Sequence, residues 1–123
     1  MKRKIIISLG SNFEQEKYIR KGMELLAGSF PGIRFSSLLW TEPLGIQSDK
    51  FVNAMALATT DLDEDAVVEI LKKAEVTCGR MPEDKALNIV KIDLDLLQYG
   101  CGRRKVADWN RSYIKQLAAE VCL

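Results

Sequence analysis

Hydrophobic positions alternate with polar or small positions in several stretches of the chain, a pattern typical of half-buried β-strands. The alternation is clearest over residues 51–60, where larger side chains occupy the odd positions. Val52 and three alanines occupy the even positions, so a helix could approach that face closely. A continuous apolar run near the start, rich in β-branched isoleucine, predicts a buried strand as well. The four predicted strands cover residues 4–9, 33–41, 51–60 and 89–99.

Apolar residues recur at intervals of three and four in the segments between these strands, which indicates amphipathic helices. Ser11 or Asn12 is a candidate cap for the first helix. Asp61 followed by Glu64 is a plausible capping pair for the second. The three predicted helices cover residues 14–27, 63–78 and 108–121.

The element order is therefore β-α-β-β-α-β followed by a C-terminal helix, within a single domain spanning residues 1–123. This order predicts an α+β protein with the ferredoxin-like split βαβ arrangement. In that fold a four-stranded antiparallel sheet carries both helices on one face. The other face would be free for a ligand or for the C-terminal helix.

Composition excludes several function classes. Lys and Arg number 18 against 17 Asp and Glu, so gross charge does not indicate binding to nucleic acid or to a membrane. The apolar run near the start is too short for a secretory signal, and no stretch approaches the roughly 20 apolar residues of a membrane span. We therefore expect a cytoplasmic protein. Without histidine, and with three widely separated cysteines, the usual zinc sites and Cys-His or Ser-His catalysis are excluded; the thiols are expected to be reduced and mostly buried.

Two aspartates on the fourth predicted strand are the strongest candidates for chemistry. Asp93 and Asp95 share one strand face, with Cα atoms roughly 6.5–7 Å apart. Magnesium is typically held by one or two carboxylates together with substrate phosphates, so this spacing suits metal–nucleotide chemistry. A solvated strand face can also carry acids without function, and the pair alone does not decide between these interpretations.

The sequence around the pair resembles a known enzyme family. The segments GSN, SSLLWTEPLG, FVNA, CGR and IDLDLLQYG occur in order between Leu9 and Gly100. Together they resemble the motifs of 6-hydroxymethyl-7,8-dihydropterin pyrophosphokinase, an enzyme of folate biosynthesis. The fold implied by that family is the ferredoxin-like arrangement already predicted from the element order.

This resemblance implies transfer of pyrophosphate from ATP, the co-substrate, to the hydroxymethyl group of the dihydropterin, with release of AMP. It implies that Asp93 and Asp95 are the catalytic pair and hold Mg²⁺, with two ions expected. The pterin-binding residues it implies are Thr41, Leu44, Gly45, Phe51, Asn53 and Tyr113. The ATP-binding residues it implies are Glu75, Arg80, Lys85 and Arg111.

The loop after the second helix departs from the family pattern. It reads MPEDKALNIVK where the family has more arginine and a tryptophan, and the family's histidine is absent. Lys85, Lys91 or the basic run 103–105 could replace the missing cations. One alternative hypothesis is a catalytically impaired relative that still binds pterin or nucleotide. Another is an interaction domain that has lost both sites.

Overall fold

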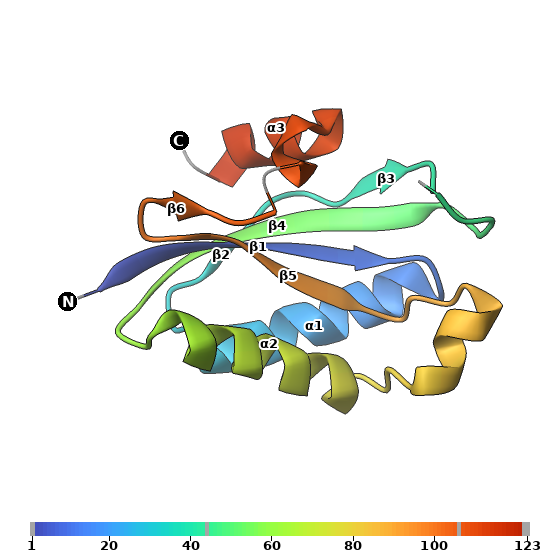
Figure 1. Ribbon diagram of the computed structural model, residues 1–123, viewed down its shortest axis with the longest axis horizontal. Helices are drawn as coiled ribbons and strands as arrows, with labels where there is room; N and C mark the ends of the chain where they lie inside the picture. Colours follow the sequence, from blue (N-terminus) through green and yellow to red (C-terminus); the bar gives the residue numbers. More distant parts are fainter. Residues whose placement is uncertain (1, 44, 106, 122–123) are drawn as a thin grey trace.

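The computed structural model describes residues 2–43, 45–105 and 107–121. Within these ranges a six-stranded antiparallel sheet forms the centre of the molecule, with helices on both faces (Figure 1). The strands are β1 (Arg3–Ser11), β2 (Arg34–Phe35), β3 (Leu39–Thr41), β4 (Phe51–Thr60), β5 (Asp93–Tyr99) and β6 (Gly102–Arg103). The helices are α1 (Gln15–Ser29), α2 (Glu64–Thr77) and α3 (Ser112–Val121), with two short 3₁₀ helices, η1 (Pro82–Leu87) and η2 (Asp108–Asn110).

The strand order is β2-β4-β1-β5-β6, and β3 also pairs with β4. The predicted mixture of helices with an antiparallel sheet is confirmed, but the predicted count of four strands is wrong. The predicted second strand is two short strands, and β6 adds a further strand beside β5. Helices α1 and α2 cover one face, and α3 covers the opposite face (Figure 1).

Strand β4 is buried on both faces because helices cover both sides of the sheet. Its even-numbered positions, from Val52 to Ala58, belong to the core beneath α1 and α2. Met55 and Leu57 point the other way and pack in the core beneath α3. The predicted alternation is therefore confirmed, and the small alanines lie on the face that two helices approach.

The break between β2 and β3 has a local cause at Ser36. The Ser36 hydroxyl accepts a hydrogen bond from the Met55 backbone N–H at 2.8 Å, which a regular strand carbonyl would otherwise accept. Ser37 then turns toward α3, where its backbone N–H and its hydroxyl both donate to the Glu120 carboxylate at 2.9 and 2.8 Å. These side-chain hydrogen bonds interrupt the strand and tie it to the C-terminal helix.

Strand β5 begins at Asp93, four residues later than predicted, because side chains hold the preceding segment. Asn12 is buried at the end of β1; its Nδ2 donates to the Asn88 carbonyl at 2.8 Å, and its Oδ1 accepts from the Val90 N–H at 2.6 Å. Lys91 donates to the Gly79 carbonyl at 2.9 Å. The loop predicted after the second helix contains η1, and these contacts hold its conformation.

The helix termini differ from the predicted caps. Neither Ser11 nor Asn12 caps α1; its N-cap is Glu14, which has a left-handed backbone and makes no side-chain capping bond. The cap of α2 is Asp63, whose carboxylate accepts from the Ala66 N–H at 2.8 Å, rather than the predicted Asp61. The predicted third helix is divided at Arg111, whose extended backbone separates η2 from α3.

Two expectations from composition can be compared with the structure. None of the helices in the described ranges is long and apolar enough to span a bilayer. Cys78 is buried, and burial raises the pKa of its thiol. Cys101 is exposed because it lies in the turn between β5 and β6, so of the two described thiols one is buried and one is not. The third cysteine, Cys122, lies outside the described residues.

Asn12→Ala is expected to destabilise the protein by about 2 kcal/mol, because it leaves the Asn88 carbonyl and the Val90 N–H without their partners. Urea denaturation should show a lower midpoint with an unchanged m-value. Asn110→Ala serves as the matched control, since Asn110 is exposed. Equal midpoints for the two variants would contradict the role assigned to Asn12.

Candidate active site

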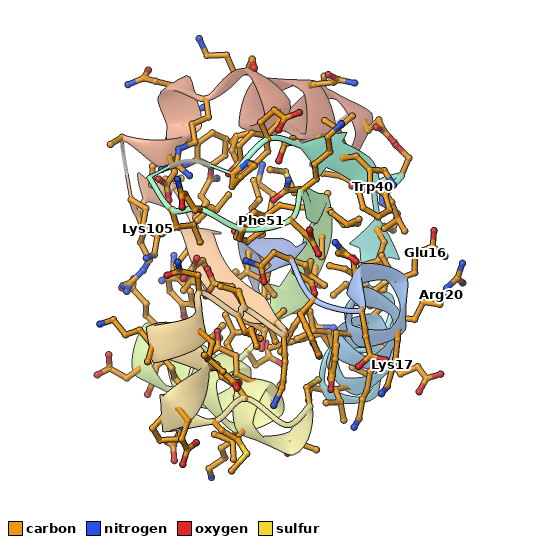
Figure 2. The ribbon with its side chains drawn as sticks, turned by 90° about the vertical axis from the view of Figure 1, so that its right-hand side faces the viewer. Glu16, Lys17, Arg20, Trp40, Phe51 and Lys105 are labelled. Atoms are coloured by element: carbon orange, nitrogen blue, oxygen red, sulfur yellow. The ribbon has the colours of Figure 1, made fainter. Side chains whose placement is uncertain are left out.

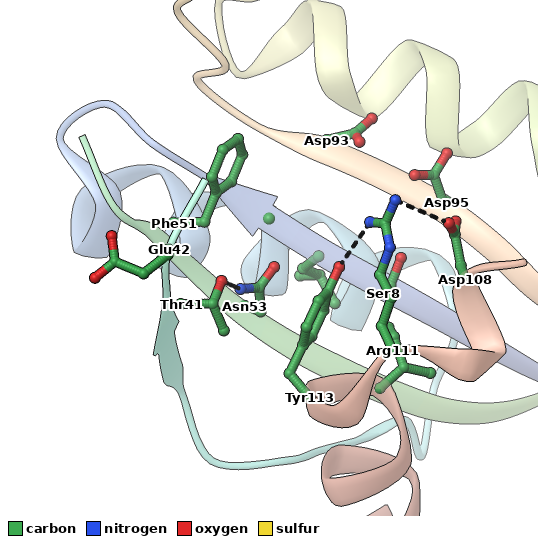
Figure 3. A pocket seen from close by; sticks show the side chains of 13 residues that line it. Ser8, Thr41, Glu42, Phe51, Asn53, Asp93, Asp95, Asp108, Arg111 and Tyr113 are labelled. Atoms are coloured by element: carbon green, nitrogen blue, oxygen red, sulfur yellow. Dashed lines mark hydrogen bonds and ion pairs between the residues drawn. The ribbon is translucent and has the colours of Figure 1, made fainter. Parts of the chain in front are cut away.

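A pocket opens between the sheet and the N-terminal end of α3, on the face opposite α1 and α2 (Figure 3). Its volume is about 160 Å³. Strands β1, β3, β4 and β5 supply its sheet side, and residues from the η2–α3 region close it. The lining residues are Ser8, Leu9, Gly10, Thr41, Glu42, Phe51, Asn53, Asp93, Asp95, Asp108, Arg111, Tyr113 and Ile114.

The β3–β4 side of the pocket presents an aromatic ring beside a polar pair. Asn53 Nδ2 donates to Thr41 Oγ1 at 2.6 Å, and this bond orients the Asn53 amide (Figure 3). Phe51 lies two residues earlier on the same face of β4. Gly10 of β1 lies opposite: a Cβ there would come within 3.4 Å of Asn53 Oδ1 and 3.8 Å of the Phe51 ring. A larger residue at position 10 would therefore narrow this side of the pocket.

Asp93 and Asp95 project from β5 into the pocket, on the side opposite Phe51 and Asn53 (Figure 3). Their shared face follows the predicted alternation, since Leu94 and Leu96 pack in the core on the other face. Burial is the main factor that raises the pKa of Asp93 from 3.8 to about 7, followed by the charge of Asp95 and a hydrogen bond shared with it. Ionising both carboxylates is therefore unfavourable in this buried position, and a bound cation would reduce their repulsion.

Arg80 and Glu75 support the acidic pair from behind β5. Arg80 Nη1 lies 2.9 Å from Glu75 Oε2 and 3.4 Å from Asp93 Oδ1. Glu75 is buried, and the same Oε2 accepts the Leu94 backbone N–H at 2.8 Å. The Glu75 carboxylate thus accepts a hydrogen bond from the backbone of β5 and holds Arg80 beside Asp93. Neither residue lines the pocket itself.

The basic run 103–105 divides its three cations among different partners. Arg103 stacks on the Trp109 ring, with Cζ 4.1 Å from the ring centroid. Arg104 pairs with Glu64 at the start of α2. Lys105 Nζ lies 3.3 Å from Asp95 Oδ1. Of the three, Lys105 alone is paired with the acidic pair, and it lies on the same face of the molecule as Phe51 (Figure 2).

The segment before α3 contributes the pocket's lining cation. Arg111 Nη1 donates to Tyr113 Oη at 3.1 Å, and Arg111 Nη2 lies 3.4 Å from Asp108 Oδ1 (Figure 3). The hydrogen bond with Tyr113 raises the pKa of Arg111 further. Because the extended backbone at Arg111 breaks the helix, its side chain and the Tyr113 ring can both enter the pocket.

The structure brings together seven of the residues predicted for the site. They are Thr41, Phe51, Asn53, Asp93, Asp95, Arg111 and Tyr113. Gly45 and Lys85 are not among the lining residues, and Leu44 lies outside the described residues. Lys91, considered above as a replacement cation, instead forms an ion pair at 3.3 Å with Asp84 and stabilises the η1 segment.

Six lining residues are not among those predicted from the sequence. Ser8 and Gly10 alternate with the buried Ile7 and Leu9 along β1, so the period of the strand could have identified their face. Glu42, Asp108 and Ile114 had no comparable signal, because loop and helix ends place them. Leu9, the sixth, is itself a core residue.

The comparison with protein families agrees with this geometry. The family model described as 7,8-dihydro-6-hydroxymethylpterin-pyrophosphokinase (HPPK) matches residues 6–121. The chain belongs to the HPPK family. The resemblance inferred from the motifs is thereby confirmed, and the activity of this family is pyrophosphoryl transfer in folate biosynthesis. A search of curated proteins found no match.

The HPPK family uses ATP and Mg²⁺, and the acidic pair of this chain fits the metal. The described ranges contain no cluster of three acidic or cysteine side chains that could hold an ion by themselves. Mg²⁺ is commonly held by one or two carboxylates, with substrate phosphates supplying further oxygen ligands. The pKa of Asp93 is raised first by burial and then by the charge of Asp95, and a divalent cation bound between the two carboxylates would offset that repulsion.

Asp93→Asn is expected to stabilise the metal-free protein at neutral and alkaline pH. The pKa of Asp93 is about 7 in the folded protein, above its ordinary value of 3.8, so the folded state holds an extra proton between those values. The contribution of Asp93 to the stability of the unsubstituted protein therefore falls as pH rises through that window. With EDTA present, the Tm advantage of the variant should grow from about pH 4 to about pH 7 and then remain constant.

Asp49→Asn is the control, since Asp49 is an exposed loop residue. Its Tm should follow that of the unsubstituted protein at every pH. A Tm difference for Asp93→Asn that does not change with pH would contradict the assigned pKa.

Proposed function

We propose that this chain catalyses the Mg²⁺-dependent transfer of pyrophosphate from ATP to 6-hydroxymethyl-7,8-dihydropterin, with release of AMP. The observation that carries the proposal is the convergence of Asp93 and Asp95 with the Thr41–Asn53 pair and Arg111 around one pocket. Family membership supports the reaction class. The convergence supports a site at which both substrates could meet.

Asp93 and Asp95 are proposed to hold Mg²⁺, two ions being the number that the family resemblance implies. Four acidic residues line the pocket, against Arg111 as its lining cation. A polyphosphate would be repelled by this pocket unless cations accompanied it. Bound Mg²⁺ would neutralise the triphosphate and lower the pKa of the substrate hydroxyl.

The pterin is proposed to lie against β3 and β4. The Asn53 amide, oriented by Thr41, would form hydrogen bonds with the polar edge of the pterin. Phe51 and Tyr113 offer aromatic faces from two different elements, and stacking between them would orient the ring. Gly45 and Leu44 keep the pterin-binding role implied by the family motif as an expectation.

The nucleotide is proposed to lie on the opposite side, toward Arg80, Arg111 and Lys105. Glu75 would act through Arg80, since its carboxylate is buried and already bonded to that guanidinium and to β5. Lys85 keeps its expected ATP contact only if η1 rearranges toward the pocket. Lys105 is proposed to replace part of the missing positive charge, because its Nζ is already 3.3 Å from Asp95.

The second candidate function is a relative that binds pterin or nucleotide without transferring pyrophosphate. The η1 segment favours it. This segment belongs to the loop after α2 that departs from the family pattern, and it carries no arginine. Hydrogen bonding by Asn12 and the Lys91–Asp84 ion pair hold it in place. Titration calorimetry with ATP–Mg²⁺ and with the pterin separately would distinguish the two. Pterin binding without AMP release supports the binder, and absence of binding by both ligands supports an interaction domain.

Asp95→Asn is expected to reduce AMP release by about 10³-fold or more, since the variant loses a carboxylate from the pair that would hold the metal. AMP can be measured by chromatography after incubation with ATP, Mg²⁺ and the dihydropterin. The circular dichroism spectrum and Tm should show a folded protein. Turnover equal to that of the unsubstituted protein would overturn the metal assignment.

Lys105→Ala is expected to have two effects of opposite sign. Removing the ammonium group beside Asp95 should strengthen Mg²⁺ binding to the free protein. The same change should lower kcat by about 10-fold to 100-fold, because a cation beside the transferring phosphates is lost. Lys73→Ala is the matched control, since Lys73 pairs with Glu69 on the exposed side of α2. An unchanged kcat with tighter Mg²⁺ binding would show that Lys105 only competes with the metal.

A further inference from the structure

A second pocket, with a volume of about 450 Å³, lies on the same sheet face as the first. Along β1 the positions on this face are Lys4, Ile6, Ser8 and Gly10. The first two line the second pocket, and the last two line the candidate active site. The pockets share no lining residue and lie at opposite ends of this face. The second is lined by Lys4, Ile6, Gln98, Arg103, Trp109, Lys115, Ala118 and Ala119.

The charge of this pocket is opposite to that of the candidate active site. Lys4, Arg103 and Lys115 line it, and no acidic residue does. Within the described part of the chain, none of these three cations has a carboxylate oxygen within 4.0 Å. Other basic residues near the two pockets do form ion pairs with carboxylates; they are Arg80, Arg104, Lys105 and Arg111. Three unneutralised cations around one depression create a positive potential that attracts an anion.

One of these cations is held in place before any ligand binds. The Arg103 guanidinium lies over the Trp109 ring, with Cζ 4.1 Å from the ring centroid. Trp109 is itself fixed, because Nε1 donates to the Leu97 carbonyl at 3.1 Å and the ring is buried in the core beneath α3. A guanidinium held in this way presents its fork of donors at little entropic cost, and that geometry matches phosphate oxygens.

Apart from Gln98, the rest of the lining is mostly apolar. Ile6 and Trp109 are core residues, and Ala118 and Ala119 form a small-residue wall on α3. The volume falls within the range usual for small-molecule sites, about 300–1,000 Å³. An inorganic ion would leave this apolar wall without a partner, whereas an organic phosphate would place its body against the wall and its charge among the cations.

We propose that the pocket between Lys4, Arg103 and Lys115 binds a small organic phosphate, at a site separate from the candidate active site. The phosphate contacts the Arg103 guanidinium and the two lysines. The organic part packs against Ile6, Ala118 and Ala119. The proposal does not depend on pyrophosphokinase activity, because neither pocket contributes a residue to the other.

Phenyl phosphate is a suitable probe, and the chain carries its own reporter. The protein has two tryptophans, Trp109 in this pocket and the half-exposed Trp40 on β3 (Figure 2). In ¹⁵N-correlated NMR spectra, the Trp109 indole N–H signal should shift saturably with phenyl phosphate, while the Trp40 signal should not. Benzyl alcohol, which has a similar ring but no charge, should produce no saturable shift.

Lys115→Glu should weaken phenyl phosphate binding by about tenfold or more, since an attractive charge becomes repulsive. Lys21→Glu on α1, beneath the opposite face of the sheet, is the charge-matched control and should leave the affinity unchanged. Arg111→Ala in the candidate active site should also leave the Trp109 titration unchanged. If Arg111→Ala loses AMP release but keeps the Trp109 titration, the loss bears on the proposed enzyme activity and not on the second pocket.

Several results would overturn the proposal. These are the absence of a saturable Trp109 shift at millimolar phenyl phosphate, or an equal shift with benzyl alcohol. Equal affinity in Lys115→Glu would place the ligand elsewhere. Inorganic phosphate binding as tightly as phenyl phosphate would refute a role for the apolar wall. Tighter binding of a short poly-glutamate peptide would instead identify a surface for an acidic protein segment.

Discussion

The structure depends on burying β1 and β4 on both faces. Ile5, Ile7 and Leu9 pack beneath α1 and α2, while Ile6 packs beneath α3. The first of these faces is closed by two long helices. The second is covered by the ten residues of α3 together with η2. Both pockets lie between this face and the η2–α3 region, so the location of the binding surfaces follows from the unequal covering of the sheet.

Electrostatics distinguish the two open ends. At one end, acids from β5, from the residue after β3 and from the segment before α3 line the pocket together with Arg111. The pKa of Asp93 is raised there, first by burial and then by the charge of Asp95. At the other end, three cations line a pocket without acids. A chain with a net charge of only +1 therefore separates its charges along a single sheet face. Gross composition conceals this separation, because the two ends cancel in the sum.

The η1 segment shows how this member of the HPPK family differs from the family pattern. Its residues lack the arginines that the pattern would place opposite the acidic strand, and Asp84 and Lys91 instead pair with each other. Asn12 fixes the far end of the segment by bonding to Asn88 and Val90. Positive charge near Asp93 and Asp95 comes from other elements: Arg80 at the end of α2, and Lys105 after β6. Any catalysis must therefore use a differently arranged set of cations.

The sequence by itself determined the long elements and the acidic pair. Alternation along 51–60 and around Asp93 and Asp95 assigned their faces correctly, because a strand's period depends only on local backbone geometry. It also determined the family, through ordered motifs spread along the chain. The tertiary structure alone decided where β2 and β3 separate, since that depends on Ser36 meeting Met55 and on Ser37 meeting Glu120. The tertiary structure alone also decided that Lys105 pairs with Asp95, whereas Arg103 stacks on Trp109 and Arg104 pairs with Glu64. Such contacts join residues far apart in sequence, and no local pattern encodes which of several neighbouring side chains will reach the other.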